Sequence, residues 1–184
     1  MFERFAPEAR RTVVRAGLLS LDAGRTVLDD DMLLLALAEA WPVDGFEVSP
    51  DAVRALLPAG PPDRPGDRDL LAGLGVDLDE IRRRLPSRRA DPAAWRLRRP
   101  RTRPLRVTLS GPAGDLRLTV AARKAVEVAL YHAARRTDGG GVVDEDLVRG
   151  LLADGSNASV AILRRLGADL PALAGRLWPL RASA

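Results

Sequence analysis

The chain has 184 residues, of which 46% are hydrophobic, and this is enough to build a core in one compact domain or two small ones. It contains no cysteine, so disulfides, cysteine-based zinc sites, iron–sulfur clusters and thiol nucleophiles are excluded. No apolar run is long enough for a membrane span, and the start MFERFAPEARR carries charges where a signal peptide needs apolar residues. We therefore expect a cytoplasmic protein with no membrane contact.

The net charge of +4 is unevenly distributed along the chain. The segment from Pro86 to Arg106 holds eight arginines and one aspartate, so the rest of the chain is slightly acidic. Lys124 is the only lysine among 29 basic residues, which we attribute to codon bias rather than to arginine chemistry. Aromatic residues make up only 4% of the chain, so the stacking platform of single-stranded nucleic-acid binders is missing.

Two helices are expected at the start of the chain. Apolar residues at helical spacing predict an amphipathic helix from Pro7 to about Leu21, with proline in its first turn. The following segment DDDMLLLALAEAW predicts a buried helix whose N-terminus is capped by the acidic run Asp29 to Asp31. A Pro- and Gly-rich stretch comes next, with one short helix predicted from Ser49 in SPDAVRALL.

The middle of the chain is interpreted as an Arg/Pro-rich connector over residues 86–116. Pro86, Pro92, Pro100 and Pro104 interrupt its arginine-rich part, and Trp95 is its single aromatic residue. Within and just beyond it, RVTLSGPAGDLRLT alternates around a Gly/Pro turn, which favours a small β-hairpin.

The second half repeats the pattern of the first. LTVAARKAVEVALYHAARR predicts an amphipathic helix with Thr119 as its N-cap, and VVDEDLVRGLLADG predicts a second acid-capped helix in which Glu145 falls opposite Asp31. The two halves also end alike, in LLAGLGVDLDEIRRRL and ILRRLGADLPALAGRL. In each ending, a glycine suits a left-handed helix end and the aspartate two positions later suits the cap of the next helix.

These elements predict an all-α fold of two pseudo-symmetric four-helix repeats that pack together. The first repeat covers residues 1–85, with an insertion at about 42–68. The connector covers residues 86–116 and the second repeat covers residues 117–180.

Four features in the right order, each duplicated or paired, resemble the double Clp N-terminal repeat of ClpC- and ClpA-type unfoldase chaperones. They are the opening FERFAPEARRTVVRA, the matching opening LTVAARKAVEVA, the acid-capped pair DDDMLLLAL and VDEDLVRGLL, and the paired LGVDL and LGADL turns. The resemblance implies a docking domain for client or adaptor proteins of a Clp protease system. No G-x-x-x-x-G-K-[ST] phosphate loop is present, so we expect a stand-alone, non-catalytic module without the ATPase motor.

The resemblance also implies candidate ligand-binding residues. In ClpC-type relatives each repeat holds a phosphoarginine through a threonine and a glutamate, and a helix N-terminus with a hydroxyl suits phosphate while a carboxylate suits guanidinium. Thr119 and Glu145 match these two positions in the second repeat. In the first repeat Ala6 replaces the threonine and Asp31 the glutamate, and the family's L-G-H-N turn is lost in both halves. We therefore expect one competent pocket in the second repeat and a degenerate one in the first.

A purely structural interpretation stands beside this functional one, because Thr119, Asp31 and Glu145 each lie where a helix needs a cap or an early acidic residue. His132, the only histidine, is interpreted as a partly exposed helix residue rather than a general base. We expect no catalytic residue, no metal and no cofactor.

The identity of the partner stays open at this stage. Phosphoarginine-bearing proteins, folded adaptors and cyclic peptides all fit, and the protein would act as an adaptor, decoy or sensor. The alternative is a nucleic-acid-associated protein that neutralises phosphates with its connector, although a flexible basic linker is the simpler interpretation. The arginines of that candidate surface are Arg96, Arg98, Arg99, Arg101 and Arg103. The oligomeric state is open, and exposed apolar residues at Trp41, Phe46 or Trp178 would favour an interface.

Overall fold

The computed structural model describes residues 1–40, 45–58, 89–100, 105–136 and 139–178. The described residues form seven α-helices and a four-stranded sheet, with two short 3-10 helices. In chain order the elements are η1 (Phe2–Arg4), α1 (Pro7–Asp22), β1 (Val27–Leu28), α2 (Asp30–Ala40), α3 (Pro50–Leu56), η2 (Pro92–Ala94), β2 (Arg96–Arg98), β3 (Thr108–Gly111), β4 (Gly114–Leu118), α7 (Val120–Arg135), α8 (Asp144–Leu152), α9 (Ala158–Arg165) and α10 (Leu170–Leu177).

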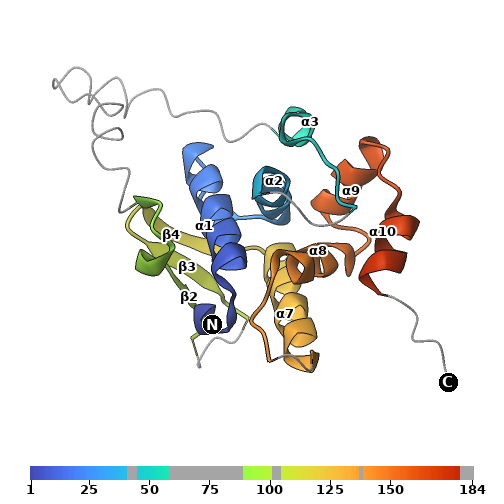
Figure 1. The fold of residues 1–184 in the computed structure, drawn as a ribbon. Coiled ribbons are helices and arrows are strands. Elements are labelled where there is room, and N and C mark those ends of the chain that lie inside the picture. Colours follow the sequence, from blue (N-terminus) through green and yellow to red (C-terminus); the bar gives the residue numbers. More distant parts are fainter. Residues whose placement is uncertain (41–44, 59–88, 101–104, 137–138, 179–184) are drawn as a thin grey trace, which may run out of the picture.

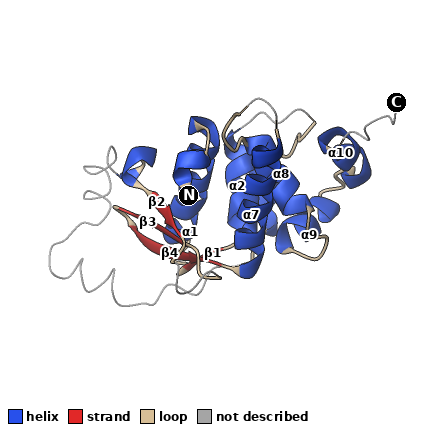
Figure 2. Ribbon diagram, turned by 90° about the horizontal axis from the view of Figure 1, so that it is seen from below, coloured by secondary structure: helices blue, strands red, loops and turns tan. Residues whose placement is uncertain are grey.

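The elements are arranged in a row from the sheet to the last two helices (Figure 1). Helix α1 lies against the sheet, α2, α7 and α8 form the centre, and α9 and α10 lie at the far end; the view from below shows the same order (Figure 2). Helix α2 has buried residues on all sides, as its almost wholly apolar sequence predicts, and it contacts α1, α3, α7, α8 and α9.

The sheet has the strand order β1-β4-β3-β2. Strands β2, β3 and β4 are antiparallel, whereas the two-residue β1 pairs in parallel with β4. Residues alternate between the two faces: Leu97, Leu109 and Leu116 are cross-strand neighbours and are all buried. Helix α1 covers this apolar face at Gly17, where an added Cβ would lie 2.5 Å from the Leu109 side chain.

The all-α prediction is wrong, because the segment interpreted as a connector supplies most of a four-stranded sheet. The hairpin expected in this region forms as β3 and β4, and β2 extends it with the alternating sequence Arg-Leu-Arg. Trp95 is fully buried, and its indole N–H donates to the Arg89 carbonyl at 2.8 Å. The burial of Trp95 and Leu97 anchors the arginine-rich strand to the core, while its arginines remain exposed.

The predicted helices of the described residues form close to their expected bounds. Gly167 adopts a left-handed conformation with φ of 72°, and the Asp169 carboxylate accepts a hydrogen bond from the Ala172 N–H at 2.8 Å, as predicted for the last turn and cap. The corresponding segment of the first half, residues 70–85, lies outside the described residues, as do residues 42–44 and 59–68 of the predicted insertion. The division into two repeats and a connector stays a prediction, and buried residues from both halves belong to one hydrophobic core.

The two halves are joined by crossed backbone pairings. Phe5, just before α1, pairs in parallel with Val142, just before α8. Leu118, just before α7, pairs in parallel with Leu28, just before α2. Matching hydrogen bonds follow, from the Ala6 N–H to the Val142 carbonyl at 2.9 Å and from the Thr119 N–H to the Leu28 carbonyl at 3.0 Å. The first helix of each half therefore begins beside the second helix of the other half.

Candidate functional site

The crossed pairings create two equivalent places where helix N-termini meet. We call the surroundings of the Phe5–Val142 pairing the α1–α8 corner and the surroundings of the Leu28–Leu118 pairing the α7–α2 corner. The four candidate pocket residues divide between them: Ala6 and Glu145 lie at the first corner, and Thr119 and Asp31 at the second.

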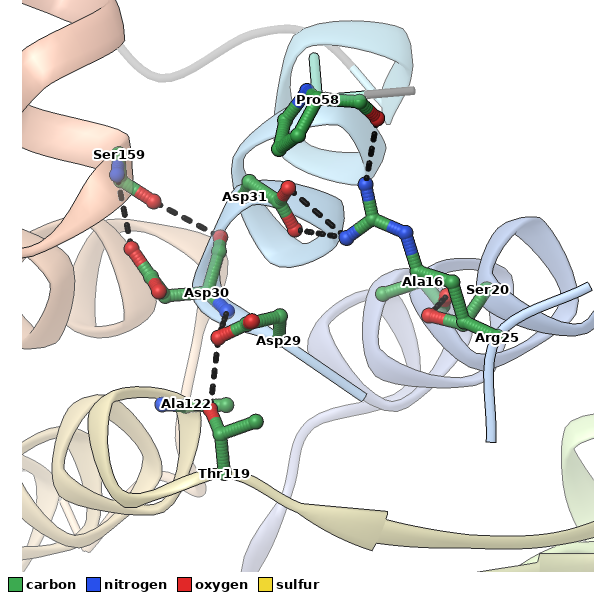
Figure 3. Close-up of polar contacts among 10 residues, drawn as sticks. All are labelled: Ala16, Ser20, Arg25, Asp29, Asp30, Asp31, Pro58, Thr119, Ala122 and Ser159. Atoms are coloured by element: carbon green, nitrogen blue, oxygen red, sulfur yellow. Dashed lines mark hydrogen bonds and ion pairs between the residues drawn. The ribbon is translucent and has the colours of Figure 1, made fainter. Parts of the chain in front are cut away.

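The side chains of the α7–α2 corner are satisfied by each other (Figure 3). The Thr119 hydroxyl donates to the Asp29 carboxylate at 2.7 Å and accepts from the Ala122 N–H at 3.3 Å, which makes it the N-cap of α7. Asp31 is 1% exposed and both its oxygens accept from one guanidinium nitrogen of Arg25, at 2.7 and 2.8 Å. Both groups are therefore already hydrogen-bonded within the protein.

Asp30, which lies between Asp29 and Asp31 in the sequence, connects the first half to α9. Its carboxylate accepts from the Ser159 N–H at 2.7 Å, and its carbonyl accepts from the Ser159 hydroxyl at 2.8 Å (Figure 3). Burial raises the pKa of the Asp30 carboxyl, although the hydrogen bonds from Ser159 act in the opposite direction. The acidic run Asp29 to Asp31 is thus a structural junction with three separate partners.

The α1–α8 corner is more open. Helix α1 has Ala6 at its N-cap, which has no polar side chain to accept from the first N–H groups, and Pro7 follows. The Gly141 backbone lies so close that an added Cβ would be 2.8 Å from the Ala6 nitrogen. The Glu145 side chain is 45% exposed and pairs with Arg149 one turn later.

A buried carboxylate with two arginine partners stabilises the start of helix α8 at this corner. Asp146 is fully buried and accepts from Arg136 at 2.5 Å, from Arg149 at 2.8 Å and from the Val143 N–H at 3.1 Å. An acidic residue at the third position of a helix that reaches back to the N-cap N–H is half of a capping box. Arg149 also donates to the Leu177 carbonyl at 2.9 Å, which ties the end of α10 to α8.

Asp144 opens α8 against the first turns of α1. Burial raises the pKa of its carboxyl, while a hydrogen bond from Thr12 acts in the opposite direction. One of its oxygens is buried without a hydrogen-bond partner.

A cavity of about 330 Å³ adjoins the α1–α8 corner. Charged, apolar and glycine residues line it together: Glu3, Arg4, Leu130, Ala133, Ala134, Arg136 and Gly139 to Gly141. Its volume lies within the range of small-molecule and side-chain pockets.

The structure does not bring Thr119 and Glu145 together, although the sequence assigns both to one repeat. Helices α7 and α8 are antiparallel, because Lys124 near the start of α7 pairs with Asp154 after α8, and Arg136 after α7 pairs with Asp146 near the start of α8. Thr119 and Glu145 therefore lie at opposite ends of this pair. Their roles in ligand binding stay predictions, and each now has neighbours from the other half.

The five arginines of the candidate basic surface differ in their surroundings. Arg96 and Arg98 are exposed on the strand β2, and Arg99 forms an ion pair with Glu127 at 3.4 Å. Arg98 is aligned across the sheet with Thr108, which is aligned in turn with Arg117. Arg101 and Arg103 lie outside the described residues.

The remaining candidate residues take structural positions. His132 is partly buried between Tyr131 and Trp178, with ring centroids 5.7 and 6.0 Å away, and burial lowers its pKa. Phe46 is 2% exposed and Trp178 is partly buried, while Trp41 lies outside the described residues. Within the described ranges no group of three or more potential ligands could hold a metal ion, and no helix is long and apolar enough to cross a membrane.

The sequence motifs do not predict the full roles of two residues at the corners, Arg25 and Asp146. Arg25 lies in a turn and would be assigned to solvent, yet it neutralises the buried Asp31. Asp146 carries a partial signal, because its position at the third residue of an acid-capped helix predicts the capping interaction but not its burial beside two arginines.

Comparison with known proteins identifies the fold. No family model matches the chain, and no curated protein matches it. Among solved structures, the N-terminal domain of the caseinolytic protease associated chaperone ClpD from Arabidopsis thaliana matches with a TM-score of 0.57 and 17% sequence identity, over 96% of this chain and 94% of that one. The chain therefore has the fold of a Clp N-terminal domain, as its sequence motifs predict.

Proposed function

We propose that this protein is a non-catalytic docking module that binds segments of client or adaptor proteins at the α1–α8 corner. The observation that supports this proposal best is the combination found there: an uncapped helix N-terminus at Ala6, the half-exposed carboxylate of Glu145, and a cavity of about 330 Å³ with both charged and apolar walls. The likeness in fold to a chaperone N-terminal domain agrees with such a role.

The same corner suits a residue that carries both a negative and a positive group. The first N–H groups of α1 would face the anion, and Glu145 would accept hydrogen bonds from the cation. Phosphoarginine has this pattern, and we propose it as the preferred side chain of the bound segment. We assign no ligand to the α7–α2 corner, although it has both a hydroxyl and a carboxylate. The Thr119 hydroxyl is already bonded to Asp29, and the buried Asp31 carboxylate is already paired with Arg25.

Calorimetric titration with free phosphoarginine tests this assignment. We expect about one site per chain, and at least tenfold weaker binding in Glu145→Gln, because a charge-assisted hydrogen bond contributes about 1.5–3 kcal/mol. Asp115→Asn is the matched control, since Asp115 is exposed on β4 and follows Gly114, which lies beside Leu21 near the end of α1 that is opposite the α1–α8 corner.

Thr119→Val separates the two corners. This variant removes the N-cap of α7, so we expect its free energy of unfolding to fall by about 0.5–2 kcal/mol while phosphoarginine binds as it does to the unchanged protein. Loss of binding in Thr119→Val with retention in Glu145→Gln would assign the ligand to the α7–α2 corner instead.

If free phosphoarginine does not bind, the preference for that side chain is abandoned but docking itself is still testable. A permanently unfolded protein, such as reduced and carboxymethylated lactalbumin, should then bind and be weakened by Glu145→Gln. Absence of binding by both probes would contradict the proposed function.

A second candidate function, association with nucleic acid, has one observation in its favour. Arg98, Thr108 and Arg117 form a row across the outer face of the sheet, and the two arginines have no acidic partner among the described residues. Duplex binding that is weaker than micromolar at low salt would remove this candidate, because phosphate contacts are strongest there.

A further inference from the structure

A second and larger cavity lies at the opposite end of the molecule from the sheet, among the end of α8, α9 and α10 (Figure 1). Its volume is about 600 Å³, within the range of pockets that hold small ligands. Most of its wall is apolar, from Leu152, Val160, Leu170, Pro171, Ala174 and Trp178.

Arg164 is the single charged side chain that lines this cavity among the described residues. It is exposed, and within that part of the chain it forms no ion pair and no side-chain hydrogen bond. The nearby acids are already committed: Asp154 pairs with Lys124 at 3.0 Å, and Asp169 caps α10 through the Ala172 N–H. The cavity therefore combines an apolar interior with one uncompensated positive charge.

Small residues leave room for a peptide backbone at the edge of the cavity. Gly155, Gly167 and Ala168 are part of its lining, and nothing lies within 4 Å of a Cβ added at Gly167. A Cβ added at Gly155 would meet only an Arg164 guanidinium nitrogen, at 3.9 Å. A chain that approaches over Gly155 would thus meet Arg164 directly.

We propose that this cavity binds the C-terminal end of a peptide whose last residues are apolar. The apolar side chain would fill the space between α9 and α10, and the terminal carboxylate would pair with Arg164, which can bind it through two parallel hydrogen bonds. A C-terminal residue carries its apolar side chain and its carboxylate on one Cα atom. This arrangement matches one apolar cavity with one positive charge at its wall. The site is separate from the α1–α8 corner and does not rest on the proposed function.

The test uses the full chain and the acetylated pentapeptide Ala-Ala-Ala-Leu-Leu, with either a free or an amidated C-terminus. Binding is followed by calorimetry and by tryptophan fluorescence, to which Trp178 in the cavity lining contributes together with Trp41 and Trp95. We expect the free acid to bind and to shift the tryptophan emission, and the amide to bind at least tenfold more weakly.

Two variants and one control assign the binding to this cavity. Arg164→Gln should weaken the free acid about tenfold and leave the amide unchanged, whereas Arg165→Gln, the exposed neighbour that does not line the cavity, should change neither by more than about twofold. Ala174→Phe should fill the cavity and weaken both peptides. Circular dichroism and a melting curve show that each variant is folded.

Three results would overturn the proposal. They are equal affinity for the free and amidated peptides, unchanged binding in Arg164→Gln, and binding of octanoate but not of the free-acid peptide, since the last result assigns the cavity to small apolar carboxylates instead.

Discussion

Asp30 joins the first half of the chain to the second through two hydrogen bonds with Ser159. Its buried carboxylate accepts the Ser159 N–H, and its backbone accepts the Ser159 hydroxyl. A buried N–H that loses its acceptor costs about 1–3 kcal/mol. Asp30→Ala should therefore lower the free energy of unfolding by that amount in a urea titration, whereas Asp30→Asn keeps an acceptor oxygen and should cost less than about 1 kcal/mol.

The pH dependence of the same pair of variants follows from the raised pKa of Asp30. Because the folded state holds the proton at pH values where the unfolded state has released it, this group makes the folded state less stable as the pH rises from about 4 through the raised pKa. Asparagine has no proton to release, so the stability of Asp30→Asn relative to the unchanged protein should increase over this range. A relative stability that falls as the pH rises would show that Asp30 is charged in the folded state.

Two glycines in helices make a matched test of packing at the level of single residues. A Cβ at Gly150 in α8 would lie 2.1 Å from the Ala125 carbonyl oxygen in α7, whereas a Cβ at Gly175 in α10 would meet nothing within 4 Å. Gly150→Ala should therefore destabilise the fold by about 1–3 kcal/mol, because two backbones must separate. Gly175→Ala should stabilise it by up to about 1 kcal/mol through helix propensity, and equal effects in the two variants would contradict the close packing of α7 and α8.

At the level of secondary-structure elements, the sheet is an integral part of the core rather than a linker. Trp95 is fully buried beside β2, and a Cβ at Gly111 on β3 would lie 2.1 Å from its ring. Trp95→Ala should lower the free energy of unfolding by about 3–5 kcal/mol, the usual cost of emptying a buried aromatic site. A loss below about 1 kcal/mol, measured by urea denaturation, would support the flexible linker that the composition suggests.

The elements that the sequence predicts correctly have strong local signals. The 3.6-residue periodicity of α1 and α7, the acid-rich start of α2, and the glycine and aspartate of the turn between α9 and α10 are all local properties, and each forms as expected. The hairpin of β3 and β4 has a local alternating signal, whereas β2 and β1 have none, because β2 has only three residues, two of them arginines, and β1 only two. Strands this short are stabilised by partners far along the chain, so their own sequence contains little information about them.

The candidate site shows the same limit. The residue types at Ala6, Asp31, Thr119 and Glu145 follow from the sequence repeat, but their grouping does not. The linear sequence suggests that each helix start, at Ala6 or Thr119, shares a site with the acidic residue of its own half. In the structure, the backbone pairings at Val142 and Leu28 instead place each helix start beside the acidic residue of the other half. Only the three-dimensional pairing contains that information.

At the level of the whole molecule, these crossed pairings make the two halves interdependent. Leu28 and Leu118 are adjacent strand partners, Phe5 pairs with Val142, and a single core contains residues of both halves. A fragment of residues 105–184 would keep β3 but would lack β1, the other partner of β4, and Phe5, the partner of Val142 before α8. We expect this fragment alone to give a poorly dispersed amide NMR spectrum, and a well-dispersed spectrum would show that the second half folds independently.

The most direct test of the account is an NMR titration of the uniformly labelled chain with phosphoarginine or the unfolded client, whichever binds in calorimetry. We expect the amide shift changes to cluster around the α1–α8 corner, at Ala6, Gly141 and Glu145, and to disappear in Glu145→Gln. Changes confined to the α7–α2 corner around Thr119 and Asp31 would contradict it, because the structure assigns no open ligand group there.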